Sequence, residues 1–208
     1  MTKIKPNWPK IIINILGFIP MALVFIAWLR GGLGVNPIQR SQQLLGDTAL
    51  ILLLMTLAIT PIKNVTGYNK LGKYKRTFGL LSFYYALAHV FVYAVIDYQL
   101  NLKLLWASIL HLWYLWASVP AFLILLVLAI TSLKKLKVAL GKKWKPIHRF
   151  VYLAGVLVVI HYMLVMKGGT GIVNGSTVKP LIAGGILLVL LVARLPFKRW
   201  FTRQVKTG

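Results

Sequence analysis

The stretch TFGLLSFYYALAHVFVYAVI, residues 77–96, contains no Lys, Arg, Asp or Glu. As an α-helix, these twenty residues rise about 30 Å, which matches the hydrocarbon core of a bilayer. One histidine, His89, lies within the stretch. Ionisable side chains inside a bilayer are costly and often mark functional sites. The stretch therefore predicts a membrane-spanning helix that carries a candidate functional residue.

Five further apolar stretches predict an all-α membrane protein, a bundle of six transmembrane helices that forms a single domain over residues 1–208. Open sheets are excluded from lipid because their backbone groups would be unsatisfied. The stretch 104–133 is too long for one upright span, so we expect residues 104–111 to form an interfacial approach to the helix that follows. The expected spans cover approximately residues 11–29, 44–62, 77–96, 112–133, 147–166 and 180–196.

The composition favours the same class. Hydrophobic residues make up 59% of the chain, mean hydropathy is +0.77 and only 13% of residues are charged, against about 25% in soluble domains. There are 25 Lys and Arg but two acidic residues, Asp47 and Asp97, and no Cys. Carboxylate metal cages, paired catalytic carboxylates, disulfides and Cys-ligated cofactors are therefore excluded. The net charge of +23 would suggest nucleic acid in a soluble protein, but here we expect membrane lipid and no nucleic acid.

The basic residues also predict the orientation in the membrane. Twenty of the 25 lie in four alternating segments: the N-terminal tail, residues 63–76, residues 134–149 and the region from residue 194 onward. The three intervening connections hold two, one and two. Because cytoplasmic loops are enriched in Lys and Arg, we expect both termini in the cytoplasm. The basic residues 134–145 are expected to lie against anionic lipid, with a docking surface for a cytoplasmic partner as the alternative.

Two of the four histidines are expected at one depth. His89 lies twelve residues beyond the cytoplasmic start of its span, and His161 lies fourteen beyond the start of the fifth span near residue 147. At 1.5 Å per residue these depths are roughly 18 and 21 Å. Two imidazoles at one level on parallel helices are suited to be the axial ligands of one haem.

The other two histidines differ. His148 lies at the inner end of the fifth span, about 20 Å along the helix axis from His161. That separation suits a second haem, although on an ideal helix the two imidazoles point about 140° apart, so a kink or an irregular turn is needed. His111 lies among Trp106, Trp113 and Trp116 and is expected in an interfacial aromatic cluster, not as a ligand.

Three segments resemble the MsrQ (YedZ) family of haem-binding membrane subunits, in the ferric-reductase-like transmembrane group. They are GGLGVNPIQRSQQLLGDTALILLLMTLAITPI (31–62), RTFGLLSFYYALAHVFVY (76–93) and ITSLKKLKVALGKKWKPIHRFVYLAGVLVVIHY (130–162). The resemblance covers most of residues 11–195. The sequence departs from the family in residues 106–118, where an Arg-Pro-Tyr element is expected and HLWYLWAS (111–118) is found.

The resemblance implies a multi-pass protein of the bacterial inner membrane with one or two haem b groups held by His89, His161 and His148. It also implies FMN, for which no residues are named. Such a subunit passes electrons to a periplasmic molybdopterin reductase (MsrP-like) that repairs oxidised methionine in periplasmic proteins, and is not itself the catalytic subunit. Its donor would be a cytoplasmic flavin reductase or the quinone pool.

Two other classes remain as alternatives: a small membrane transporter and a structural membrane scaffold without haem. A transporter would be supported by inverted repeats, broken helices and midplane carboxylates, and the sequence has no clear inverted repeat or midplane carboxylate. An electron carrier is favoured because two axial histidines would leave no open iron position. An optical spectrum of the purified protein separates the three classes.

Overall fold

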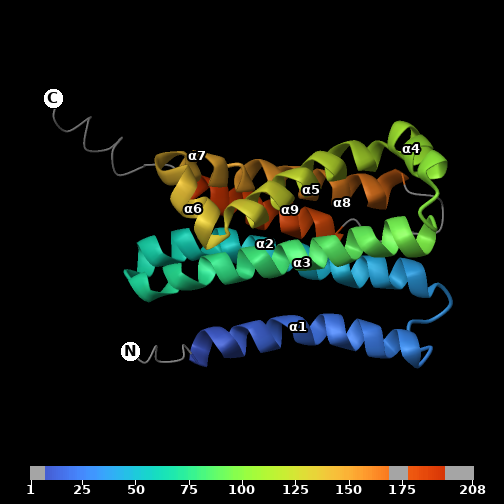
Figure 1. Ribbon diagram of the computed structural model, residues 1–208, viewed down its shortest axis with the longest axis horizontal. Helices are drawn as coiled ribbons and strands as arrows, with labels where there is room; N and C mark the ends of the chain where they lie inside the picture. The colour runs from blue at the N-terminus through green and yellow to red at the C-terminus, as the bar shows by residue number, and fades with distance from the viewer. Residues whose placement is uncertain (1–7, 169–177, 195–208) are drawn as a thin grey trace.

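The structure is a computed structural model that describes residues 8–168 and 178–194. In these two ranges every regular element is helical (Figure 1). The elements in chain order are α1 (Trp8–Leu29), α2 (Pro37–Thr66), the 3-10 helix η1 (Asn69–Tyr74), α3 (Lys75–Phe91), the π-helix η2 (Val92–Asp97), α4 (Leu102–His111), α5 (Trp113–Thr131), α6 (Lys134–Leu140), the 3-10 turn η3 (Gly141–Lys143), α7 (Trp144–His148), α8 (Val151–Gly168) and α9 (Val178–Val192).

The long helices share one apolar core. α2 packs along α3, α5 packs along α8, and α9 packs against α8 and α2. Close van der Waals packing holds these helices to one another within lipid, and the same side chains fix which faces meet. The buried side chains of this core come from five helices: Leu50, Leu53, Leu57, Phe83, Leu125, Leu128, Val151, Ala154, Val159, Ala183 and Leu187.

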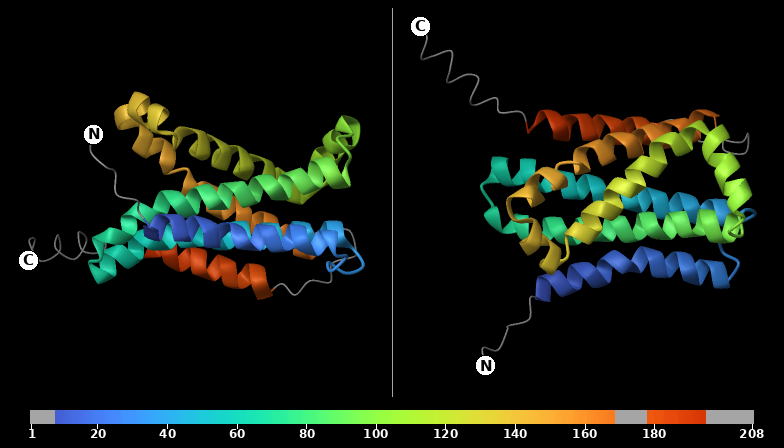
Figure 2. Two further views of the ribbon diagram at one scale, coloured as in Figure 1. Left: turned by 60° about the horizontal axis from the view of Figure 1, so that its bottom comes forward. Right: turned by 45° about the horizontal axis from the view of Figure 1, so that its top comes forward.

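Helix α1 lies along one flank of the bundle, as Figures 1 and 2 show, and none of its residues is buried. The Tyr85 hydroxyl of α3 attaches it, donating a hydrogen bond to the Gly17 carbonyl (2.7 Å) and accepting one from the Met21 amide (2.9 Å). These two backbone groups are partners in a regular helix, so the hydroxyl bridges the turn around Pro20. A second attachment runs from the Trp28 indole N–H to the Ser41 hydroxyl.

We expect Tyr85→Phe to weaken the attachment of α1. The substitution keeps the buried ring but removes two hydrogen bonds to backbone groups of α1, at a cost of about 1 kcal/mol. Thermal unfolding of the detergent-purified protein should show a lower midpoint. The matched control is Tyr84→Phe, because Tyr84 is exposed and its hydroxyl has no hydrogen bond among the described residues. Equal midpoints for the two variants would contradict the bridge.

The protein is a multi-pass membrane protein. Four helical segments of the described chain are long and apolar enough to cross a membrane. They are α1, α2, the continuous segment Asn69–Asp97 that consists of η1, α3 and η2, and α5. The segments Lys134–His148 and Val151–Met166 together pass the same test as one broken span, bent by 45°. Helix α9 has 15 residues and is shorter than a full span. Part of the expected sixth span, residues 195–196, lies outside the described residues.

Two expected boundaries have clear outcomes. The expected break before residue 112 is confirmed, because α4 ends at His111 and Leu112 adopts an extended conformation (φ −100°, ψ 103°) before α5 begins. The expected start of the fifth span at residue 147 is wrong, because α8 begins at Val151. His148 ends the separate short helix α7, so rotation on one ideal helix does not describe its relation to His161.

Candidate functional site

His89 of α3 and His161 of α8 lie together in the bundle. Their ring centres are 6.4 Å apart and the ring planes are nearly perpendicular, at 83°. They are 72 residues apart in the sequence, and the packing of α2, α3, α5 and α8 brings them together. Both side chains are half-buried.

Each imidazole is held at Nδ1 by a backbone carbonyl. Nδ1 of His89 is 2.9 Å from the Gln42 oxygen, and Nδ1 of His161 is 3.0 Å from the Tyr114 oxygen. A carbonyl oxygen can only accept, so Nδ1 carries the proton and Nε2 keeps its lone pair. Neither Nε2 has a hydrogen-bond partner among the residues described. Metal-binding histidines typically have this arrangement, since the second hydrogen bond fixes the tautomer and the ring orientation.

The separation of the rings matches two ligands of one metal ion. A metal–imidazole nitrogen bond is about 2 Å long and the ring centre lies about 1.1 Å further, so two rings on opposite sides of one ion have centres about 6.3 Å apart. In the described part of the chain, no three His, Cys, Asp or Glu residues are grouped to hold an ion. Ions held by side chains alone usually have three or four protein ligands, whereas haem iron needs only two axial ones. The histidine pair therefore fits haem.

A cavity of about 730 Å³ surrounds the pair, within the range of about 300–1,000 Å³ usual for bound small molecules. Its walls come mainly from α2, α3, α5 and α8 and are mostly apolar. Gly46 of α2 leaves room for the His89 ring, since a Cβ there would lie 3.3 Å from Nδ1 of His89. The sequence interpretation missed Gly46 and the Gln42 and Tyr114 carbonyls. Main-chain oxygens and a glycine carry no sequence signal until the facing helix is known.

His148 lies apart from this pair. Its Nε2 is 3.1 Å from the Thr131 hydroxyl, and its ring stacks on Trp144 with centres 4.0 Å apart. It is not among the described residues that line the cavity. Lys75 and Lys137 lie close enough to act on it electrostatically. The structure therefore surrounds His148 with cations and an indole at the end of the bundle that carries α6 and α7 (Figure 1).

His111 is exposed at the end of α4. The neighbouring rings of Trp113 and Trp116 lie 5.6 Å apart, and the Trp116 indole N–H donates to the Ile109 carbonyl. Residues 106–118, which depart from the family pattern, form this corner between α4 and α5. They contribute to the site through the Tyr114 carbonyl.

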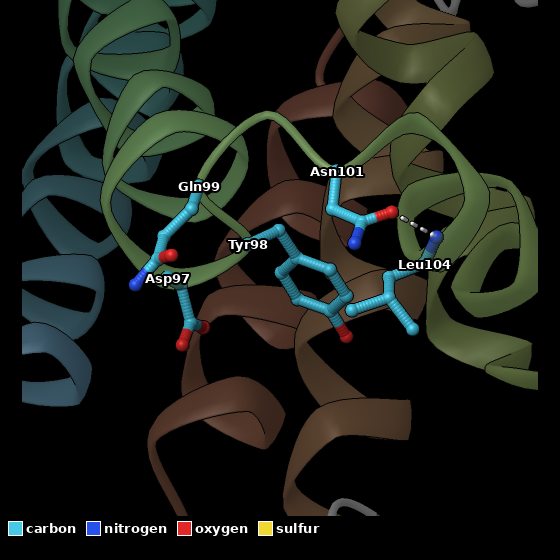
Figure 3. A pocket seen from close by; sticks show the side chains of 5 residues that line it. All are labelled: Asp97, Tyr98, Gln99, Asn101 and Leu104. Atoms are coloured by element: carbon cyan, nitrogen blue, oxygen red, sulfur yellow. Dashed lines mark hydrogen bonds between the residues drawn. The ribbon is translucent and has the colours of Figure 1, made fainter.

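A second pocket, of about 400 Å³, lies at the C-terminal end of η2 and is lined by Asp97, Tyr98, Gln99, Asn101 and Leu104 (Figure 3). Asp97 and Tyr98 also line the histidine cavity, so the two spaces share a wall. The loop has two consecutive left-handed residues, Gln99 (φ 48°) and Leu100 (φ 55°), a conformation that is strained without glycine. The Asn101 side chain closes the loop by accepting from the Leu104 amide (3.2 Å).

The fold and the site define a class: multi-pass helical membrane proteins with two facing histidines in an apolar cavity. The chain belongs to the family described as ferric reductase like transmembrane component, which matches residues 45–159, and within that group to the MsrQ family. Proteins of Brucella ovis, Brucella canis and Brucella suis are each 33% identical over 91% of this chain and 82% of their own length. Each is named protein-methionine-sulfoxide reductase heme-binding subunit MsrQ. No solved structure matches the chain.

Proposed function

We propose that this protein is a b-type cytochrome subunit that carries electrons across the bacterial inner membrane to a methionine sulfoxide reductase catalytic subunit. The observation that carries the proposal is the histidine pair, with ring centres 6.4 Å apart and both Nδ1 atoms bonded to carbonyls. The names of the relatives support haem as the group bound and the reductase system as the setting.

In this proposal each residue of the site has a defined task. Haem b, when bound, supplies reversible one-electron transfer. His89 and His161 would hold its iron through Nε2, while the Gln42 and Tyr114 carbonyls keep both rings oriented and Gly46 leaves space for the His89 ring. Because two histidines would ligate the iron, electron transfer would be favoured over oxygen chemistry. Apolar walls exclude water from the iron.

We further propose six membrane spans with both termini in the cytoplasm. The start of α1, the end of α9 and the basic helices α6 and α7 lie at the same end of the bundle (Figures 1 and 2), which supports this orientation under the positive-inside rule. The opposite, periplasmic end holds α4 and the second pocket. In this orientation the end of α3 that carries His89 lies on the periplasmic side.

The partners are proposed from the membership of the MsrQ family. The acceptor is a periplasmic molybdopterin reductase subunit of the MsrP type, which repairs oxidised methionine. The donor is a cytoplasmic flavin reductase or the quinone pool. His148, at the inner end, is proposed to hold a second carrier, either another haem b or FMN, that shortens the electron path from the donor.

The optical spectrum of the purified protein tests the central proposal. A Soret band with sharp α and β bands on reduction is expected for a haem with two histidine ligands. A folded preparation without haem would contradict the proposal and favour a transporter or a structural scaffold.

The orientation has its own test. Reporter fusions after Lys70 and Lys143 should report a cytoplasmic location, and a fusion after Asn101 should report a periplasmic one, because the basic segments resist translocation. Alkaline phosphatase and a fluorescent protein, which are active on opposite sides, give complementary readouts at each position. A periplasmic signal after Lys143, or a cytoplasmic one after Asn101, would overturn the orientation.

A further inference from the structure

Asp47 and Asp97 are the two acidic side chains of the sequence, and both line the cavity that holds the histidine pair. They come from different elements, Asp47 from the middle of α2 and Asp97 from the end of η2. By contrast, none of the Lys and Arg side chains in the described part of the chain lines this cavity. In a sequence with 25 basic residues, both acidic side chains thus lie at the histidine cavity.

Asp97 is linked to one histidine through a single residue. Its Oδ2 accepts a hydrogen bond from the Gln42 side-chain amide (3.1 Å), and the Gln42 backbone oxygen accepts the Nδ1 hydrogen bond of His89 (2.9 Å). The carboxylate therefore anchors the residue whose carbonyl orients the imidazole. Asp97 is itself exposed, so solvent screens part of its direct field, and its link to the site runs through Gln42.

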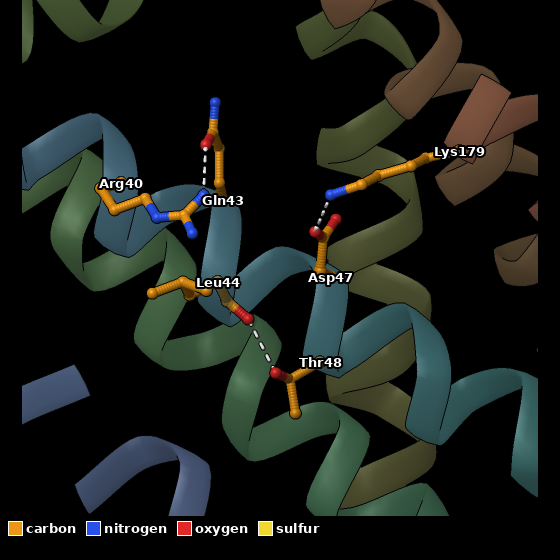
Figure 4. Close-up of polar contacts among 6 residues, drawn as sticks. All are labelled: Arg40, Gln43, Leu44, Asp47, Thr48 and Lys179. Carbon is orange, nitrogen blue, oxygen red and sulfur yellow. Dashed lines mark hydrogen bonds and ion pairs between the residues drawn. The ribbon is translucent and has the colours of Figure 1, made fainter. Parts of the chain in front are cut away.

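Asp47 directly follows Gly46, the glycine that leaves room for the His89 ring. Its ion-pair partner is Lys179 of α9, with Nζ 3.7 Å from Oδ2 (Figure 4), and it also interacts with the Tyr162 side chain of α8. The Asp47 side chain is 33% exposed and the Lys179 side chain 69% exposed. The Lys179 ammonium is therefore the more exposed of the two groups. It neutralises the negative charge of Asp47 only in part on the side that faces the cavity.

We propose that Asp47 and Asp97 lower the reduction potential of the haem held by His89 and His161, so that this haem is a stronger electron donor to its acceptor. The oxidised iron centre carries one more positive charge than the reduced one. A nearby carboxylate therefore stabilises the oxidised form, and burial and second-sphere contacts are established means of tuning such potentials. This inference rests on the proposed function, because it requires haem at the histidine pair.

Spectroelectrochemical titration of the purified holoprotein tests the proposal. Asp97→Asn and Asp47→Asn keep the side-chain shape while removing the charge, and each should shift the midpoint potential upward. The double variant should show a larger upward shift than either single variant. An unchanged or lowered potential in both single variants would overturn the proposal.

Two variants are expected to shift the potential in the opposite direction, which a merely structural role would not produce. Asn36 lines the cavity and caps α2 by accepting from the Gln39 amide, and Asp caps a helix as well as Asn does. Asn36→Asp should therefore lower the midpoint potential with the cap intact, and Lys179→Gln should lower it by freeing Asp47. A rise in both would overturn the proposal. These two variants also decide the question if the Asp variants lose haem.

The matched control is Lys103→Gln, which removes an exposed charge at the same end of the protein from a side chain that does not line the cavity. Its potential should stay near that of the wild type, because this side chain, unlike those of Asp47, Asp97 and Asn36, does not line the cavity. A shift as large as that of Lys179→Gln would mean that overall charge, not the cavity, sets the potential. The failures are distinguishable: absence of haem from the wild type refutes the proposed function, whereas bound haem that is insensitive to these charges refutes only this inference.

Discussion

His89→Ala and His161→Ala should each abolish the bis-histidine haem spectrum. In the proposed haem site, each substitution would remove one of the two iron ligands, and no third His, Cys, Asp or Glu is grouped with the pair in the described chain to replace it. Loss of an axial bond changes the spin state of the iron or releases the haem. Optical and electron paramagnetic resonance spectra of the purified variants, with haem content by pyridine haemochrome, measure the effect.

His111→Ala is the matched control, because it removes an imidazole from an exposed position outside the cavity. Its spectrum should match that of the wild type. If His111→Ala lost the spectrum while His161→Ala kept it, the histidine pair would not be the haem site.

His148→Ala should slow reduction from the cytoplasmic side many-fold while leaving the outer haem intact. His89 lies fourteen residues beyond Lys75, about 21 Å along α3, so electrons from the inner surface must cross most of a core about 30 Å thick. A carrier held by His148 would divide that distance. In sealed vesicles, a cytoplasmic-side donor should reduce the haem slowly in the variant. Dithionite together with membrane-permeant redox mediators should reduce the haem as fast in the variant as in the wild type.

Thr131→Val provides the companion variant, since the Thr131 hydroxyl lies 3.1 Å from Nε2 of His148. Removing the hydroxyl keeps the imidazole and frees its nitrogen, so inner-side reduction should be retained. Equal rates for His148→Ala and the wild type would remove His148 from the electron path and leave a single-haem carrier, fed by quinol at another position.

Much of the architecture could be predicted from residue patterns, because lipid imposes a simple rule. A chain in a bilayer must satisfy its backbone internally, so apolar runs such as residues 77–96 predict helices directly. The break before α5 was predictable for the same reason, since residues 104–133 exceed the length of one span. The break at Arg149 and Phe150 was not, because a bend of 45° depends on the packing of α7 and α8.

For the site, the sequence by itself determined which residue types were available and, through helical rise, that His89 and His161 lie at similar depth. Only the tertiary structure decided that the two rings face one cavity, because rotation about each helix axis is set by side-chain packing across α2, α3, α5 and α8. It also supplied the Gln42 and Tyr114 carbonyls, which are present in every residue and identify nothing until the chain folds. The gathering of Asp47 and Asp97 around the same cavity depends on the same packing, since 50 residues separate them in the sequence.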